Sequence, residues 1–183
     1  MTIKKFRTMD LIVLTTAAII TDILLALFGL IGIRLYLAIS YPIIILCYIR
    51  WRKYGLFSHM AVVFAHFILY GLYLDVGWLI TLAHILALMM FALILPILKT
   101  KTYNKKRVEM KYNILLYLGI YLTVFLAEWI LFAIFGFGLE LLNHALNHSL
   151  NLLLGLGLIM IMAYQKDLMV NMHQYLLEKD EDK

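Results

Sequence analysis

Long apolar stretches alternate with short polar or basic connections along the whole chain. Most of these stretches approach the roughly 20 residues that a helix needs to cross a hydrocarbon layer of about 30 Å. The pattern predicts six transmembrane helices, at residues 9–30, 36–49, 56–74, 78–98, 112–135 and 141–164. The second stretch is short and contains Pro42, so we expect it to be kinked or barely long enough to span.

No internal repeat, linker or low-complexity tract divides these stretches. We therefore expect residues 1–183 to form a single all-α membrane domain, a bundle of six transmembrane helices. The first apolar run is too long for the core of a signal peptide, so it is interpreted as an uncleaved span. The charged end "LEKDEDK", from about residue 177 to 183, predicts a short disordered tail.

Composition agrees with a membrane location. Hydrophobic residues make up 64% of the chain and charged residues 15%, and the mean hydropathy is +0.92, which is far above that of a soluble domain. Cys47 is the single cysteine, which excludes an internal disulfide and a cysteine-rich zinc site.

The basic residues predict the orientation. Of the 16 Lys and Arg, only Arg34 falls on the opposite side of the predicted membrane from the rest. The positive-inside rule therefore places both termini in the cytoplasm. This distribution accounts for the net charge of +5 without a nucleic-acid partner.

Polar residues gather near the predicted outer ends of the last three spans. On the sixth span, one helix face carries Glu140, His144, Asn147, His148 and Asn151, with Asn143 beside it. The same depth in the neighbouring spans holds His84, Glu128, Trp78 and Trp129. Unsatisfied polar groups facing lipid would cost on the order of 1–3 kcal/mol each, so this face must meet protein or water.

Two interpretations of this polar face remain open. The amides and imidazoles either hydrogen-bond between helices, or they line a polar cavity that opens outward, which the number of ionisable groups favours. Asp22, in the middle of the first span, has two interpretations as well: a hydrogen-bond partner of a neighbouring helix, which is favoured, or a group that handles a ligand or a proton.

Catalytic chemistry finds little support. His144 and His148 have the spacing of two zinc ligands, but "HALNH" lacks the glutamate that serves as general base in zinc hydrolases. His66 and His84 lie in no sequence pattern that indicates haem ligands. The sequence also contains neither a serine elbow nor a Gly-rich phosphate loop. We expect no enzymatic activity, no metal and no cofactor.

The first-helix sequence "RTMDLIVLTTAAIITDILLALFG" and six spans with short outer loops resemble the substrate-binding S component of an energy-coupling factor (ECF) transporter. The resemblance implies a vitamin or similar micronutrient bound near the outer face. It also implies a transmembrane coupling subunit and two cytoplasmic ABC-type ATPases as partners. Because Thr2 follows the start methionine, the nickel and cobalt branch, which uses a histidine there, is disfavoured.

Carried over to this chain, the resemblance assigns two sets of residues. Docking to the coupling subunit would use small residues of the first span, Ala17, Ala18 and Thr21. Substrate binding would use Arg34, Trp78, His84, Glu128, Trp129, Asn143, His144, Asn147, His148 and Asn151. The alternatives are a scaffold subunit of the rod-shape and cell-wall elongation machinery, which needs no cavity, and a small membrane enzyme.

Overall fold

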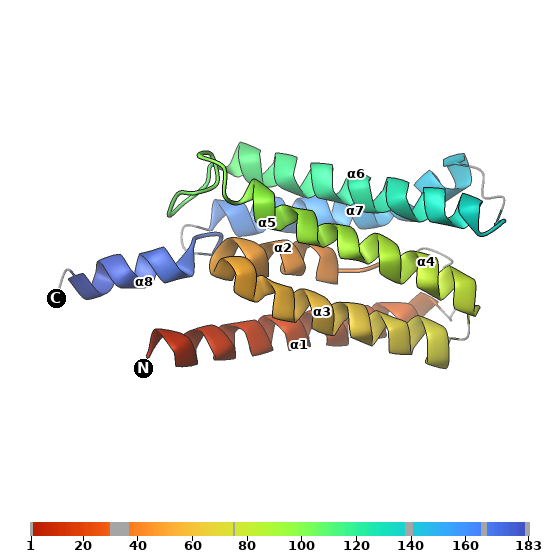
Figure 1. Cartoon of the computed structure of the whole chain (residues 1–183), viewed down its shortest axis with the longest axis horizontal. Helices are drawn as coiled ribbons and strands as arrows, with labels where there is room; N and C mark the ends of the chain where they lie inside the picture. Colours follow the sequence, from red (N-terminus) through yellow and green to blue (C-terminus); the bar gives the residue numbers. More distant parts are fainter. Residues whose placement is uncertain (1, 30–36, 75, 138–140, 166–167, 182–183) are drawn as a thin grey trace.

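The structure, a computed structural model, describes residues 2–29, 37–74, 76–137, 141–165 and 168–181, and within these ranges the regular elements are helical (Figure 1). The helices are α1 (Ile3–Gly29), α2 (Ser40–Trp51), η1 (Arg52–Tyr54), α3 (Gly55–His66), η2 (Phe67–Tyr73), α4 (Trp78–Leu88), η3 (Met89–Leu93), α5 (Ile94–Ile97), α6 (Met110–Ile134), α7 (Leu141–Tyr164) and α8 (Met172–Glu181). The predicted all-α fold is confirmed.

Five helical stretches in the described ranges are long and apolar enough to cross a membrane, which indicates a multi-pass membrane protein. They are Ile3–Leu27, Ser40–Tyr73, Trp78–Ile97, Met110–Ile134 and His144–Tyr164. The second stretch reverses direction at η1, so α2 and α3 pack against each other as a hairpin. The chain therefore passes along the bundle six times, as the apolar pattern predicts.

Helix α2 differs from the predicted second span of residues 36–49. It begins at Ser40 and has 12 residues, a length of about 18 Å at 1.5 Å per residue, so it does not reach across a bilayer on its own. Pro42 lies in its first turn, where a missing backbone N–H does no harm, and it therefore causes no kink.

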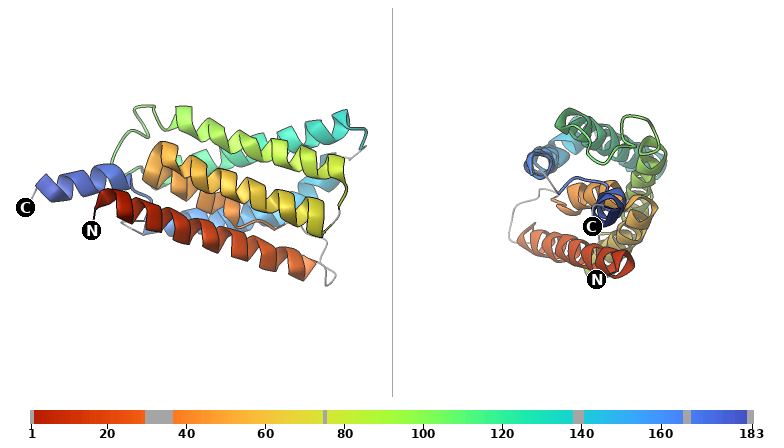
Figure 2. Two further views of the ribbon diagram at one scale, coloured as in Figure 1. Left: turned by 60° about the horizontal axis from the view of Figure 1, so that its bottom comes forward. Right: turned by 90° about the vertical axis from the view of Figure 1, so that its left-hand side faces the viewer.

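The α2 helix is the core of the bundle. Every residue of α2 except Ile43 is buried, and the helix contacts α1, α3, α5, α6, α7 and α8. The end-on view shows it inside the ring of longer helices (Figure 2, right). A helix that is hydrophobic on all sides is stable only in such an enclosed position.

Gly55 allows the tight hairpin between α2 and α3. A Cβ at this position would lie 2.7 Å from the backbone nitrogen of Tyr48. The two helix backbones therefore meet at a distance that only glycine permits.

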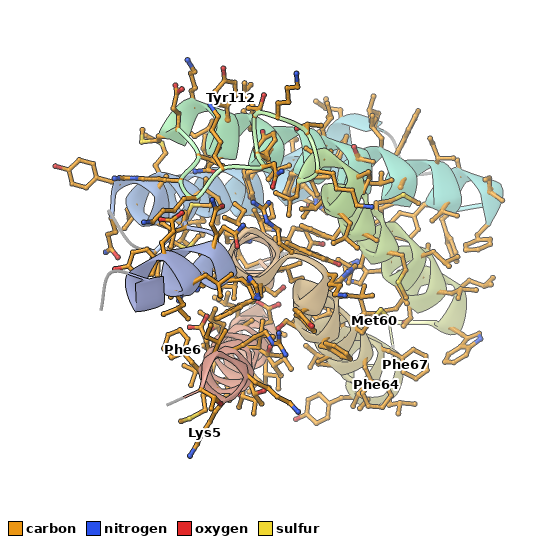
Figure 3. All side chains as sticks on the ribbon, turned by 60° about the vertical axis from the view of Figure 1, so that its left-hand side comes forward. Lys5, Phe6, Met60, Phe64, Phe67 and Tyr112 are labelled. Carbon is orange, nitrogen blue, oxygen red and sulfur yellow. The ribbon has the colours of Figure 1, made fainter. Side chains whose placement is uncertain are left out.

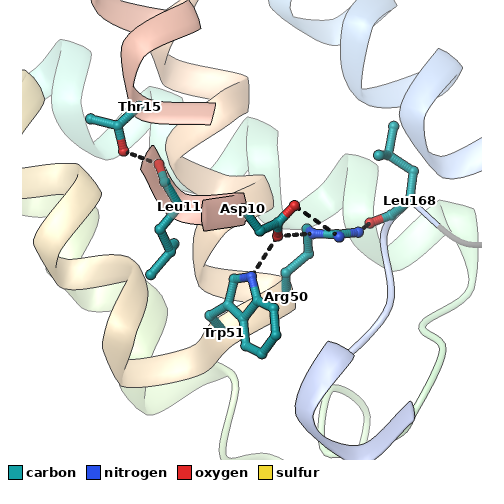
Figure 4. Close-up of polar contacts among 6 residues, drawn as sticks. All are labelled: Asp10, Leu11, Thr15, Arg50, Trp51 and Leu168. Carbon is teal, nitrogen blue, oxygen red and sulfur yellow. Dashed lines mark hydrogen bonds and ion pairs between the residues drawn. The ribbon is translucent and has the colours of Figure 1, made fainter. Parts of the chain in front are cut away.

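A partly buried ion pair fixes the end of α2 that lies near the chain termini (Figure 4). The guanidinium of Arg50 donates through Nε to Asp10 Oδ2 at 2.8 Å, and through Nη1 to the carbonyl oxygen of Leu168 at 2.8 Å. The indole of Trp51 donates to the same carboxylate. One charged group thus ties α1, α2 and the segment before α8 together.

The C-terminal segment is helical over most of the stretch, about residues 177–183, for which a disordered tail is predicted. Helix α8 continues to Glu181, because its apolar residues Met172, Tyr175 and Leu176 pack against the cluster around Trp51. Glu178 also forms an ion pair with Lys106 of the connection between α5 and α6.

Both termini lie at the same end of the bundle, together with the hairpin turn η1 and the connection from α5 to α6 (Figure 1). These are the segments that carry the Lys and Arg residues. Along the bundle, large apolar side chains are exposed on the described outer surface: Phe64 is 63% exposed and points away from the bundle with Met60 and Phe67 (Figure 3). Such a surface suits contact with lipid tails.

Candidate functional site

The candidate site lies between helices at the end of the bundle opposite the termini. The end of α3, the start of α4, the end of α6 and the start of α7 all meet there (Figures 1 and 2). His84 sits in the second turn of α4, Glu128 in the last two turns of α6, and His144 in the first turn of α7.

Four ionisable side chains form a continuous hydrogen-bonded chain through the interior. Asp22 Oδ2 lies 2.8 Å from His66 Nε2, and His66 Nδ1 lies 3.1 Å from His84 Nε2. His84 Nδ1 lies 2.9 Å from Glu128 Oε1. None of the four residues is more than 5% exposed. This hydrogen-bonded chain of side chains therefore links α1, α3, α4 and α6 through the buried interior.

The contacts connect two carboxyl groups through two imidazoles across the interior of the bundle. Carboxyl and imidazole groups that are connected in this way within a membrane bundle can pass a proton between them.

Asp22 and Asn151 also satisfy the backbone where α2 begins, in the middle of the bundle. The N–H of Ser40 donates to Asp22 Oδ1 at 3.1 Å, and the N–H of Ala38 donates to Asn151 Oδ1 at 3.0 Å. Backbone donors at this depth find no water in a bilayer and need such partners. The predicted structural role of Asp22 agrees with these contacts.

A cavity of about 220 Å³ adjoins the hydrogen-bonded chain. Its lining combines polar and ionisable side chains with a few apolar ones. The lining residues are Tyr70, Val76, Ile80, Thr81, His84, Glu128, Phe132, His144, Asn147 and His148. Tyr70 reaches it from the π-helical segment η2, a wider turn that is often found at functional sites.

Three cavity residues come close enough to share one ligand. Glu128, His144 and His148 each offer one atom, and the three atoms lie within 4.8 Å of one another. All three residues are buried. Such a group of carboxylate and imidazole can bind a cation or hydrogen-bond a polar solute.

The structure brings together five of the ten predicted substrate-binding residues. His84, Glu128, His144, Asn147 and His148 line the cavity. Asn151 is buried and bonds to Ala38 instead. This separation arises because Asn151 lies deeper in the bundle, at the level where α2 begins.

Two other predicted residues, Trp78 and Trp129, are not part of the cavity lining. Trp78 is 60% exposed at the start of α4 and packs on Phe67, while Trp129 is half-buried beside the cavity residue Glu128. Arg34 and the side chain of Asn143 lie outside the described residues.

The site prediction omits His66, Tyr70 and Tyr121; the hydroxyl of Tyr121 lies 3.2 Å from Nδ1 of the cavity residue His148. The signal for His66 was its position as an ionisable residue within a span. The two tyrosines had no such signal, because tyrosine is common in membrane helices.

Of the predicted docking residues, Ala18 is 1% exposed and faces the chain's own core. Ala17 is exposed and Thr21 is half-buried, so these two remain candidates for contact with another protein.

A larger pocket, about 570 Å³, lies at the termini end near Arg52, Lys99 and His173. It contains none of the predicted site residues. Its lining is basic, as expected for a surface near lipid headgroups.

Comparisons with protein-family models, characterised proteins and solved structures find no match to this chain.

Proposed function

We propose that this chain is the substrate-binding membrane subunit of an importer of the ECF type, which captures a small polar nutrient. The observation that carries the proposal is the cavity of about 220 Å³ lined by Glu128, His144, Asn147 and His148. A polar void inside an apolar bundle is costly to keep unless it binds something.

The orientation of the cavity supports uptake. The basic residues at the termini end favour the cytoplasmic side by the positive-inside rule. The cavity, at the other end of the bundle, would then face the outside, where a nutrient is captured.

The cavity suits a small solute. Its volume of about 220 Å³ is below the roughly 300–1,000 Å³ of sites for drug-sized ligands. Imidazole, amide and carboxylate groups beside the rings of Tyr70 and Phe132 favour a polar compound with a single heteroaromatic ring.

Energy for uptake would come from partners. The sequence contains no Gly-rich phosphate-binding loop, so active transport by this chain requires separate ATPases. In the proposed assembly, a transmembrane coupling subunit connects the chain to two cytoplasmic ABC-type ATPases.

Native mass spectrometry of the detergent-purified chain tests ligand binding. We expect a co-purifying small molecule on the wild type, and binding at least about tenfold weaker in Glu128→Gln and Asn147→Ala, which remove polar contacts in the cavity. Asn104→Ala, an exposed asparagine at the other end of the bundle, is the matched control and should bind normally. An empty wild type, together with unchanged uptake in both cavity variants, would refute the proposal.

Co-purification from the native membrane separates the proposed assembly from the scaffold alternative. Capture of ATPases and a coupling subunit supports transport. Capture of cell-wall synthesis proteins in their place contradicts it and favours a scaffold.

A further inference from the structure

We infer that Glu128, His144 and His148 form a binding site for one divalent transition-metal ion, with zinc as the preferred metal. The sequence predicted no metal site, because two histidines on one helix are weak evidence alone. The structure adds a carboxylate from a second helix, α6, to the two imidazoles of α7.

The spacing of the three residues fits a metal. Zinc lies about 2.0–2.2 Å from nitrogen and oxygen ligands, which places neighbouring ligand atoms of a tetrahedron about 3.3–3.6 Å apart. His148 Nε2 and Glu128 Oε2 are already 3.3 Å apart. The third ligand, from His144, lies within 4.8 Å of the other two, so a small side-chain rotation completes the set.

Two of the three atoms that would hold the metal make no hydrogen bond in the described part of the chain. Glu128 Oε2 and His144 Nε2 are both buried, and neither makes a hydrogen bond within the described part of the chain. The two residues are only 4% and 3% exposed. A buried polar atom without a partner is costly, and a bound cation would remove that cost at both positions.

Tyr121 contacts Nδ1 of His148, the ring nitrogen that the metal would not use. The hydroxyl of Tyr121 donates to the carbonyl oxygen of His148 at 2.9 Å and lies 3.2 Å from His148 Nδ1. His148 Nε2 lies 3.3 Å from Glu128 Oε2, so this nitrogen and this carboxylate oxygen are placed to bind one cation together.

Neighbouring groups orient the ligands as in known metal sites, where ligand side chains are themselves hydrogen-bonded. His84 Nδ1 contacts Glu128 Oε1 at 2.9 Å, which leaves Oε2 directed at the histidines. The ring of Phe125 stacks on His144 with centroids 4.7 Å apart. The site is therefore held from both α4 and α6.

The ligand set suggests the metal and its use. Two imidazoles and one carboxylate suit zinc and related divalent ions, and three protein ligands leave a fourth position for water or a solute. The cavity adjoins this position, with Asn147 and Thr81 in its lining. Metal binding does not depend on the transport proposal, because it is a property of the isolated chain.

Metal titration of the chelator-treated, detergent-purified full chain, without a polyhistidine tag, tests the inference. We expect one equivalent of Zn²⁺ per chain, measured by calorimetry, and an intense visible spectrum of tetrahedral geometry with Co²⁺. X-ray absorption of the zinc-loaded wild type should show two imidazoles and oxygen. Binding well below one equivalent, or a shell of oxygen ligands alone, would overturn the inference without any variant.

Variants locate the site. Glu128→Gln, His144→Gln and His148→Gln should each weaken Zn²⁺ binding by about 100-fold or more, since each removes a direct ligand, whereas removing a neighbouring group costs about 10–100-fold. His173→Gln, which removes an exposed histidine of α8, is the matched control and should bind normally. Unchanged affinity in all three cavity variants, or loss in the control, would contradict the site.

The two proposals fail separately. Zinc binding without any co-purified solute supports the metal site and removes the support for transport. Solute binding by a chain that takes up no metal supports the transport proposal and contradicts the metal site.

Discussion

Asp22 makes contacts in two directions from the middle of α1. One carboxylate oxygen accepts the N–H of Ser40 at the first residue of α2, and the other meets His66 Nε2 of α3. The carboxylate therefore caps a helix that belongs to another part of the chain, where the positive end of the helix dipole favours a negative charge.

Replacing Asp22 by alanine should lower the free energy of unfolding by about 2–3 kcal/mol, because two buried partners lose a charged acceptor. Asp22→Asn keeps an acceptor for Ser40 and should cost less. Unfolding in mixed micelles of mild detergent and SDS measures the difference.

Glu109→Ala provides a control for this comparison. Glu109 is an exposed carboxylate paired with Lys111, so its loss should change the free energy of unfolding by no more than about 0.5 kcal/mol. Equal effects of Asp22→Ala and Glu109→Ala would show that the contacts of Asp22 add no stability.

At this scale the sequence predicted some residues of the site and missed others. The spacing of His144 and His148 was sufficient to place both on a protein-facing surface with Glu128. The same helical spacing could not show that Asn151 lies outside the cavity, because the partner of Asn151 is a backbone N–H at Ala38, far away in the sequence. Contacts between a helix and the end of another helix leave no periodic signal.

At the scale of helices, Tyr117 of α6 packs directly against Gly155 of α7. A Cβ on Gly155 would lie 1.9 Å from the hydroxyl oxygen of Tyr117, whose ring is fully buried. The same hydroxyl is within 3.3 Å of the carbonyl oxygen of Asn151. Gly157, two residues on, has no atom of the described structure within 4 Å of such a Cβ.

These two glycines provide a matched pair of substitutions. Gly155→Ala should destabilise the protein by about 1–3 kcal/mol, because the added methyl group cannot fit without moving Tyr117. Gly157→Ala should be neutral or stabilising by up to about 1 kcal/mol, since alanine is the better helix former. Thermal unfolding of both variants in detergent measures the difference, and equal midpoints would contradict the packing.

Hydrophobic periodicity was sufficient to predict where most helices lie. It did not give the extent of α2, whose first backbone N–H is bound by Asp22. The charge of residues 177–183 did not reveal α8, which packs against the cluster around Trp51. Both are tertiary contacts that override the local pattern.

At the scale of the whole molecule, the two ends of the bundle differ in character. The termini end carries the basic connections and the Asp10–Arg50 ion pair, whereas the other end holds the polar cavity. The asymmetry of the Lys and Arg residues was sufficient to predict that the termini share one end. The cavity, in contrast, arises from four helices whose contacts only the fold reveals.

Cysteine labelling tests the orientation. Because Cys47 is fully buried, the wild type should show little reaction with a membrane-impermeant maleimide. Trp78→Cys should be labelled in intact cells, and His173→Cys only after the membrane is permeabilised, since the two positions lie at opposite ends. The reverse pattern would place the cavity end in the cytoplasm.

The shortness of α2 has a further consequence for anything held in the cavity. Because α2 occupies only the half of the interior nearest the termini (Figure 1), none of its residues lines the cavity. If the chain imports a solute as proposed, the buried residues of α2 stand between the cavity and the termini end. Passage of the solute to that end would then require α2 to shift or the whole bundle to reorient.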